Sequence, residues 1–107
     1  MYFTIAVCGT HGKSTTTAMA GMALEGTADP LVFLGTKIFE WGKKNIRLPK
    51  KEPDSFLIES CEYHNSFLNI HPNIIIVTNC EPDHLDFFGS EEAYYEAFQR
   101  FAEQLPS

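Results

Sequence analysis

Residues 6–17 of the chain read AVCGTHGKSTTT, a stretch that joins an apolar run to a helical pattern. Residues 4–8 (TIAVC) predict a short buried strand, and apolar residues recur at helical spacing after the two glycines. A strand that ends in a glycine turn and leads into a helix directs unpaired N–H groups and the positive end of the helix dipole toward an anion. Lys13 adds a mobile positive charge, and the Ser14 hydroxyl is placed to bind magnesium. The stretch therefore predicts a nucleotide phosphate site.

The match to the general loop pattern G-x-x-x-x-G-K-[ST] is partial, because Val7 stands where the first glycine is expected. An ordinary strand-to-helix turn with a surface lysine is the alternative interpretation. The run Thr15, Thr16 and Thr17 favours a ligand, since three β-branched polar residues are a poor start for an ordinary helix. The predicted strand and helix also lie on the correct sides of the glycines.

Composition limits the size and the partners of the protein. The chain has 107 residues, 44% of them hydrophobic and 21% charged, which is typical of one small globular domain. Its formal net charge of -6 argues against a nucleic-acid partner, which would need a concentrated basic surface. Six of the eight basic residues lie within residues 37–51, which we interpret as a solvated loop or edge ribbon, with direct substrate contact as the alternative.

The sequence predicts a cytoplasmic protein that does not cross a membrane. No apolar run approaches the ~20 residues that span a bilayer, and the amino terminus lacks the pattern of a signal peptide. Cys8, Cys61 and Cys80 form no C-x-x-C pair, and an odd number of cysteines suits a reducing compartment.

The rest of the chain predicts an α/β fold with a mostly parallel sheet and flanking helices. Near-continuous apolar runs bounded by turn residues are typical of strands that are covered on both faces, and they occur at residues 55–60 and 73–79. Residues 31–34 predict a further strand. Residues 35–51 predict a ribbon or a long loop, and residues 64–72 a short helix that Pro72 closes. A last helix begins after Ser90, a good capping residue. No strand follows it, so we expect a truncated domain over residues 1–107.

Two further residues are candidates for the phosphate site. Glu59 ends one predicted strand, and His84 lies just beyond the end of another. Ligands of open α/β sheets gather outside the carboxyl ends of the strands, where the glycine loop also emerges. Ser14, Glu59 and His84 could therefore complete a magnesium site around a triphosphate, although imidazole is a less usual magnesium ligand than oxygen.

Other polar residues near these two leave alternatives open. Cys61-x2-His64 and Cys80-x3-His84 have spacings that suit structural zinc, whereas the simpler interpretation is that both cysteines pack at strand ends. Asp83 and Asp86 either form a turn and a cap or orient His84. Glu62, His64 and Asn65 either start a helix or face a bound substrate.

Three stretches together, GTHGKSTTTAM, IESCEYHNSFL and IIIVTNCEPDHLDFF, resemble the central ATP-binding domain of the Mur ligases. The resemblance covers nearly the whole chain, and it is strongest to the branch that adds L-alanine to UDP-N-acetylmuramate. It implies a truncated central domain, with the amino-terminal UDP-binding domain and the carboxyl-terminal amino-acid domain both outside these residues. The helix sequence EEAYYEAFQRFAEQL contains no lysine, whereas several branches carry a carbamylated lysine there. This difference favours the alanine-adding branch or its murein-peptide-recycling relative.

The resemblance also implies a reaction and a role for each site residue. The ATP phosphates would lie on Gly9, Thr10, His11, Gly12, Lys13, Ser14 and Thr15. Lys13 would meet the γ-phosphate, Ser14 and Glu59 would bind Mg²⁺, and His84 would serve a second metal, which makes Lys13, Glu59 and His84 the catalytic set. The family phosphorylates a substrate carboxylate, and an amine attacks the acyl phosphate to give an amide, ADP and phosphate. A nucleotide-binding module without catalysis is the other hypothesis, and we expect the isolated stretch to be inactive.

Overall fold

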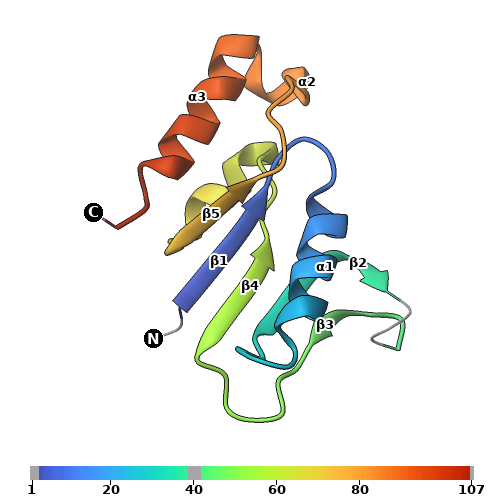
Figure 1. The fold of residues 1–107 in the computed structure, drawn as a ribbon. Coiled ribbons are helices and arrows are strands. Elements are labelled where there is room, and N and C mark those ends of the chain that lie inside the picture. The colour runs from blue at the N-terminus through green and yellow to red at the C-terminus, as the bar shows by residue number, and fades with distance from the viewer. Residues whose placement is uncertain (1–2, 39–41, 107) are drawn as a thin grey trace.

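The computed structural model describes residues 3–38 and 42–106, with the backbone alone described at residues 36–38 and 63–64. In this part of the chain five strands form one sheet in the order β3-β2-β4-β1-β5 (Figure 1). The strands are β1 (Phe3–Cys8), β2 (Leu31–Ile38), β3 (Lys44–Arg47), β4 (Ser55–Glu59) and β5 (Ile74–Val77). The helical segments are α1 (Lys13–Leu24), the 3-10 helix η2 (Tyr63–Asn69), α2 (Leu85–Phe88) and α3 (Glu91–Ala102).

Strand pairing confirms the mostly parallel α/β fold. Strand β1 pairs in parallel with both β4 and β5, and β2 pairs in parallel with β4. Among the five described strands only β2 and β3 pair antiparallel, and they form the edge ribbon that residues 35–51 predicted. Because the parallel strands share one direction, the segments that follow β1, β4 and β5 all leave at the same edge of the sheet.

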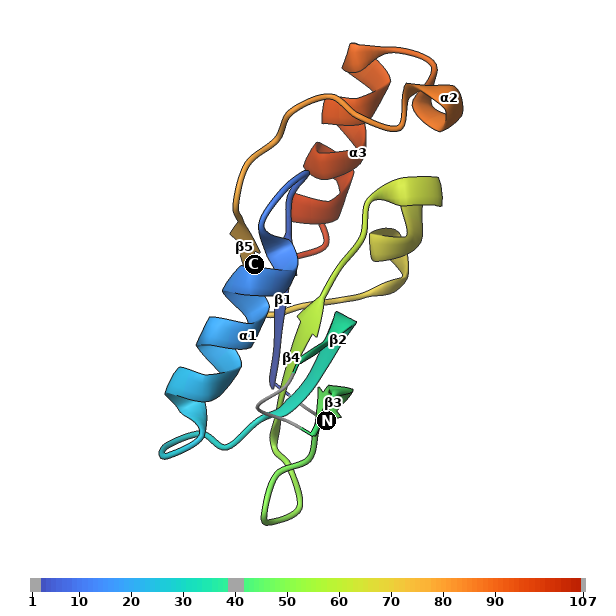
Figure 2. The same ribbon diagram turned by 90° about the vertical axis from the view of Figure 1, so that its right-hand side faces the viewer.

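Alternate residues of β1 face two separate hydrophobic clusters, as the period of a strand requires. Val7 packs on the α1 side, in a cluster with Ala18, Val32, Leu34 and Leu57. The other cluster, Ala6, Cys8, Phe67, Ala97 and Phe101, lies on the side of η2 and α3. Figure 2 shows α1 and η2 on opposite sides of the sheet. A strand covered on both faces explains why residues 4–8 read as a continuous apolar run.

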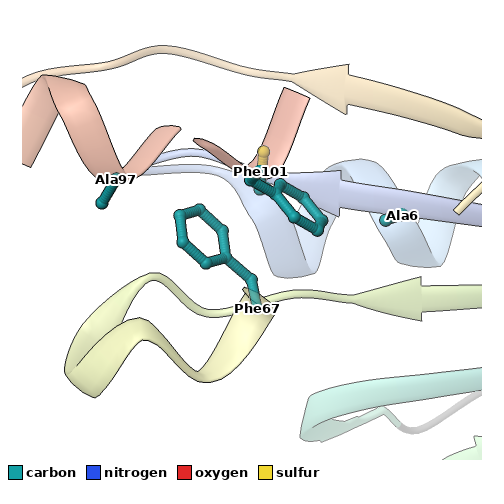
Figure 3. Close-up of a cluster of buried hydrophobic side chains, with 5 residues drawn as sticks. Ala6, Phe67, Ala97 and Phe101 are labelled. Atoms are coloured by element: carbon teal, nitrogen blue, oxygen red, sulfur yellow. The ribbon is translucent and has the colours of Figure 1, made fainter. Parts of the chain in front are cut away.

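Aromatic rings join η2 to α3. Phe67 of η2 and Phe101 of α3 stack with their ring centroids 4.4 Å apart, between the two segments (Figure 3). Phe98 meets Phe67 edge to face at 5.2 Å. This packing fixes α3 beside the carboxyl edge of the sheet, where the glycine loop lies.

The structure places some strand and helix boundaries differently from the prediction. Strand β2 continues four residues beyond Leu34, to Ile38, because β3 gives it a partner. Strand β5 is shorter than predicted, and the predicted short helix is the 3-10 segment η2. Helix α2 follows His84 and was not predicted. No helix in the described residues has the length and apolar character of a membrane span.

Candidate nucleotide phosphate site

The glycines of the loop between β1 and α1 are required by its geometry. Gly9 has a φ of 135°, and a Cβ atom there would lie 2.1 Å from Thr78 Oγ1 and 3.0 Å from the Asn79 carbonyl oxygen. Gly12 has a φ of 82° and occupies the N-cap position of α1. Both backbone conformations favour glycine. The loop can therefore turn tightly and still pack against the segment that follows β5.

The first half of the loop is hydrogen-bonded to this segment. The Thr10 N–H donates to the Asn79 carbonyl at 3.3 Å, and the His11 N–H donates to Asn79 Oδ1 at 3.0 Å. Asn79 Nδ2 and Thr78 Oγ1 both donate to the His11 carbonyl, at 2.8 and 2.6 Å. The N–H groups of Thr10 and His11 are thus occupied, and their predicted contact with phosphate stays a prediction. The His11 side chain is exposed and forms a surface pair with Glu81, at 3.7 Å.

The second half of the loop leaves N–H donors for an anion. Thr16 N–H begins the helical hydrogen bonding by donating to the Gly12 carbonyl at 2.9 Å. The preceding N–H groups of the first turn have no partner within a helix, and the N-cap residue Gly12 has no side chain that could accept from them. An anion can therefore bind at Lys13, Ser14 and Thr15, where the helix dipole adds to the attraction.

Ser14 and Glu59 form a pair of oxygen ligands beside this turn. Ser14 Oγ donates to Glu59 Oε1 at 2.6 Å, and the Gly35 N–H donates to Glu59 Oε2. The register that pairs Val7 with Glu59 brings the end of β4 to the level of the loop. A hydroxyl and a carboxylate in contact are the donors that Mg²⁺ prefers, so the residues present fit this ion.

Lys13 and His84 both contact Glu62, which the sequence left open as either a helix start or a residue that faces a bound substrate. Lys13 Nζ lies 3.8 Å from Glu62 Oε2, and His84 Nε2 lies 3.6 Å from Glu62 Oε1. Lys13 also donates to the Gly9 carbonyl at 3.1 Å. The Glu62 side chain is 0% exposed, and a buried carboxylate needs such partners to offset the loss of water. No sequence signal indicated these contacts of Glu62, because they join segments that are far apart in the chain.

The three predicted magnesium ligands lie around one loop, but the described contacts do not bring all three together. Ser14 contacts Glu59, whereas His84 contacts Glu62 and Asp83. Asp83 Oδ1 accepts a hydrogen bond from the backbone N–H of His84 at 2.7 Å, which agrees with a turn-forming role, and its Oδ2 lies 4.0 Å from His84 Nε2. Asp86 lies in the first turn of α2.

The zinc alternative finds no support in the described residues. Among them no three His, Cys, Asp or Glu side chains gather into a group that could hold a metal ion. The side chain of His64 lies outside the described residues. Burial, with a contribution from the charge of Glu62, raises the pKa of Cys80, and burial followed by the charge of Glu62 raises that of Cys8 to about 12.

Known proteins match the chain in sequence and in structure. The family model described as "Mur ligase middle domain" matches residues 7–107. The UDP-N-acetylmuramate--L-alanine ligase of Arthrobacter sp. (strain FB24) is 44% identical over 104 residues, which are 96% of this chain and 22% of that protein. The enzyme of the same name from Lachnoclostridium phytofermentans is 47% identical over 103 residues, 95% of this chain and 21% of that protein. The chain thus spans about a fifth of the length of these curated relatives.

Two solved structures share the fold. The UDP-N-acetylmuramate-alanine ligase MurC of Thermotoga maritima superposes with a TM-score of 0.83 at 32% identity, over 97% of this chain and 24% of that one. The UDP-N-acetylmuramate:L-alanyl-gamma-D-glutamyl-meso-diaminopimelate ligase of Neisseria meningitides superposes with a TM-score of 0.84 at 27% identity, over 99% of this chain and 37% of that one.

Proposed function

Because this chain belongs to the Mur ligase family, through its middle domain, we propose that it is the ATP-binding part of a ligase that joins L-alanine to UDP-N-acetylmuramate. One observation carries the proposal: the Ser14 hydroxyl at the start of α1 contacts Glu59 at 2.6 Å, beside the lysine of the glycine loop. The names of the relatives that are 44% and 47% identical support the alanine-adding branch. The recycling ligase of the same family is the alternative, favoured only by a structural neighbour of lower identity.

The first turn of α1 would bind the phosphates of ATP. Its N–H groups and Lys13 provide positive charge on one side of the triphosphate. Ser14 and Glu59 would hold Mg²⁺, and His84 a second metal. Bound Mg²⁺ would neutralise charge that develops on the transferring phosphoryl group. Glu59 cannot easily rotate away, because Ser14 and the Gly35 N–H hold its two oxygens.

In the proposed reaction a carboxylate oxygen of UDP-N-acetylmuramate attacks the γ-phosphorus of ATP, and ADP leaves. The amine of L-alanine then attacks the acyl carbon, loses a proton, and expels phosphate to leave an amide. Lys13 would stabilise negative charge in the first step from its place at the loop. We assign Lys13, Glu59 and His84 to catalysis on this basis. Such an enzyme would work in the cytoplasm, where ATP is available.

A nucleotide-binding module without catalysis is the second candidate. It is favoured by the match of residues 7–107 to a middle domain alone. We expect these 107 residues by themselves to bind ATP without completing the ligase reaction. Ligase activity would need the parts of the relatives that this stretch does not match.

Calorimetric titration of the 107-residue chain with ATP, with and without Mg²⁺, tests the proposed site. We expect binding that Mg²⁺ strengthens. Lys13→Ala should weaken ATP binding by about tenfold to a hundredfold, because a hydrogen bond to a charged group contributes roughly 1.5–3 kcal/mol. Lys51→Ala is the control, since it removes the same charge from the loop before β4. Equal affinities of the two variants would contradict the role of Lys13.

A further inference from the structure

A buried chain of hydrogen bonds connects the glycine loop to α3. Thr10 Oγ1 lies 2.6 Å from the Tyr94 hydroxyl, and this hydroxyl lies 3.3 Å from Glu62 Oε1. Tyr94 and Glu62 are both 0% exposed, and Thr10 is 8% exposed. Glu62 is the residue that pairs with Lys13 and His84. A single hydroxyl of α3 therefore touches the loop on one side and the partner of two candidate catalytic residues on the other.

The number of hydroxyl protons limits which atoms can donate in this series of hydrogen bonds. The Tyr94 hydroxyl has one proton, which it can donate either to Thr10 or to Glu62. A hydrogen bond to a carboxylate is stronger than one to a neutral hydroxyl, so the proton belongs on the Glu62 side. Thr10 Oγ1 accepts from the Glu81 N–H at 2.9 Å, and its one proton is shared between the Tyr94 oxygen and the Glu81 carbonyl, which lies 2.7 Å away. Among the three side chains of this hydrogen-bonded chain, Glu62 Oε2 is the buried oxygen without a hydrogen-bond partner, and it faces Lys13 Nζ at 3.8 Å.

The ring of Tyr94 is fixed independently of its hydroxyl. It packs edge to face on Phe88 at 5.1 Å and against Phe98 at 5.2 Å. Ser90 caps the same helix one turn earlier, where its Oγ accepts from the Ala93 N–H at 3.1 Å. A rigid element thus carries the hydroxyl to the loop from a position 84 residues away in the chain.

We propose that Tyr94 is a positioning residue for nucleotide binding, whose hydroxyl holds Thr10 of the loop and the Glu62 carboxylate in place before ATP arrives. The inference rests on the proposed function, because it assigns a role to Tyr94 in the same site. Its physical basis is preorganisation: a loop that is already ordered loses less conformational entropy when the ligand binds. The position of Lys13 is fixed indirectly, since its partner Glu62 is held in place.

Tyr94→Phe is the direct test, because it removes the hydroxyl and keeps the ring. Tyr95→Phe is the matched control: it removes the hydroxyl of the adjacent tyrosine, whose side chain is exposed. In the nucleotide-free chain, amide hydrogen exchange at Thr10 and His11 should be several-fold faster in Tyr94→Phe than in Tyr95→Phe. The amides of the central strands β1 and β4 should exchange at the same rate in both variants. A residue that only stabilises the whole fold would instead speed exchange in the strands as well.

The same two variants are then titrated with ATP and Mg²⁺. Tyr94→Phe should bind ATP about threefold to tenfold more weakly than Tyr95→Phe, the range expected for one lost hydrogen bond. Equal exchange rates and equal affinities in the two variants would overturn the inference, as would faster exchange throughout the strands. If the unaltered chain binds no ATP, the proposed function fails, and the exchange rates alone decide whether Tyr94 holds the loop.

A second pair of variants tests the bond from the loop side if Tyr94→Phe does not fold. Thr10→Val removes the hydroxyl that Tyr94 contacts, and Thr10→Ser keeps it. Thr10→Val should speed amide exchange at His11, and Thr10→Ser should restore the slow rate. Equal rates in these two variants would overturn the inference.

Discussion

Glu59 is held at both carboxylate oxygens by separate segments of the chain. Ser14 of α1 binds one oxygen, and the Gly35 N–H of β2 binds the other. The approach of β2 depends on glycine, since a Cβ atom at position 35 would lie 2.8 Å from Glu59 Oε2. The atom in the way is the end of a flexible side chain, so a larger residue would displace the carboxylate rather than the backbone.

Gly35→Ala should therefore reduce the effect of Mg²⁺ on ATP affinity and leave the fold intact. The expected loss is about tenfold or more, as for other residues that orient a metal ligand. The measurement is ATP affinity by calorimetry at increasing Mg²⁺ concentration. Gly26→Ala is the control, because a Cβ atom there meets nothing within 4 Å. If Gly35→Ala and Gly26→Ala respond equally to Mg²⁺, Glu59 has no role in binding the ion.

The sequence predicted the residues whose evidence is local and missed those brought in by packing. Lys13 and Ser14 stand in a short pattern, and Glu59 ends a strand whose direction is readable from apolar runs. Gly35 contacts Glu59, and Tyr94 contacts Thr10, because of strand register and helix packing, which a single sequence does not reveal. Their contacts connect residues 24 and 84 positions apart.

Helices and strands were predicted where one segment carries its own signal. The cap of α3 is such a case: Ser90 precedes two acidic residues, and its Oγ accepts from the Ala93 N–H as expected. The four-residue helix α2 was missed because it is too short to show a helical period. The end of β2 was also missed, because the antiparallel partner that extends it lies beyond a turn.

The contacts of Arg47 explain how the edge ribbon formed by β2 and β3 is held in place. Arg47 of β3 pairs with Asp29 and with Glu25, the latter at 3.3 Å, and it donates to the Pro30 carbonyl at 2.9 Å. The Lys50 N–H and the Arg47 side chain lower the pKa of Asp29. These contacts attach the ribbon to the turn after α1, which supports the interpretation as an edge ribbon.

Removal of the α3 cap should destabilise the element that carries Tyr94. Ser90→Ala should lower the free energy of unfolding by about 1 kcal/mol, the usual cost of losing an N-cap. Ser90→Asp keeps an acceptor for the Ala93 N–H and should retain most of the stability. Urea denaturation followed by circular dichroism measures both variants. Equal stability of Ser90→Ala and Ser90→Asp would show that the cap contributes nothing.

The segments that carry the candidate site residues meet at one edge of the sheet. The loop after β1, Glu59 at the end of β4 and Asn79 after β5 all lie there, because the three strands are parallel neighbours. The apolar runs were enough to predict this convergence. They could not predict the strand order, which depends on how each connection packs across the sheet.

A cavity at the opposite edge of the sheet is an alternative place for a nucleotide to bind. This cavity of about 320 Å³ is lined by the turn after α1 and the loop before β4. Figure 1 shows these two segments at the amino ends of the parallel strands. The cavity lining includes Glu25, Asp29, Lys50, Lys51 and Asp54. The two edges offer distinct sites, so the position of a bound nucleotide distinguishes them without ambiguity.

Amide chemical shifts of the ¹⁵N-labelled chain, recorded during titration with ATP and Mg²⁺, test the phosphate site most directly. We predict that the largest changes fall on Gly12, Lys13, Ser14 and Thr15, with further changes at Gly35 and Glu59. Changes concentrated on residues 25–29 and 49–54, or no changes at all, would contradict the account.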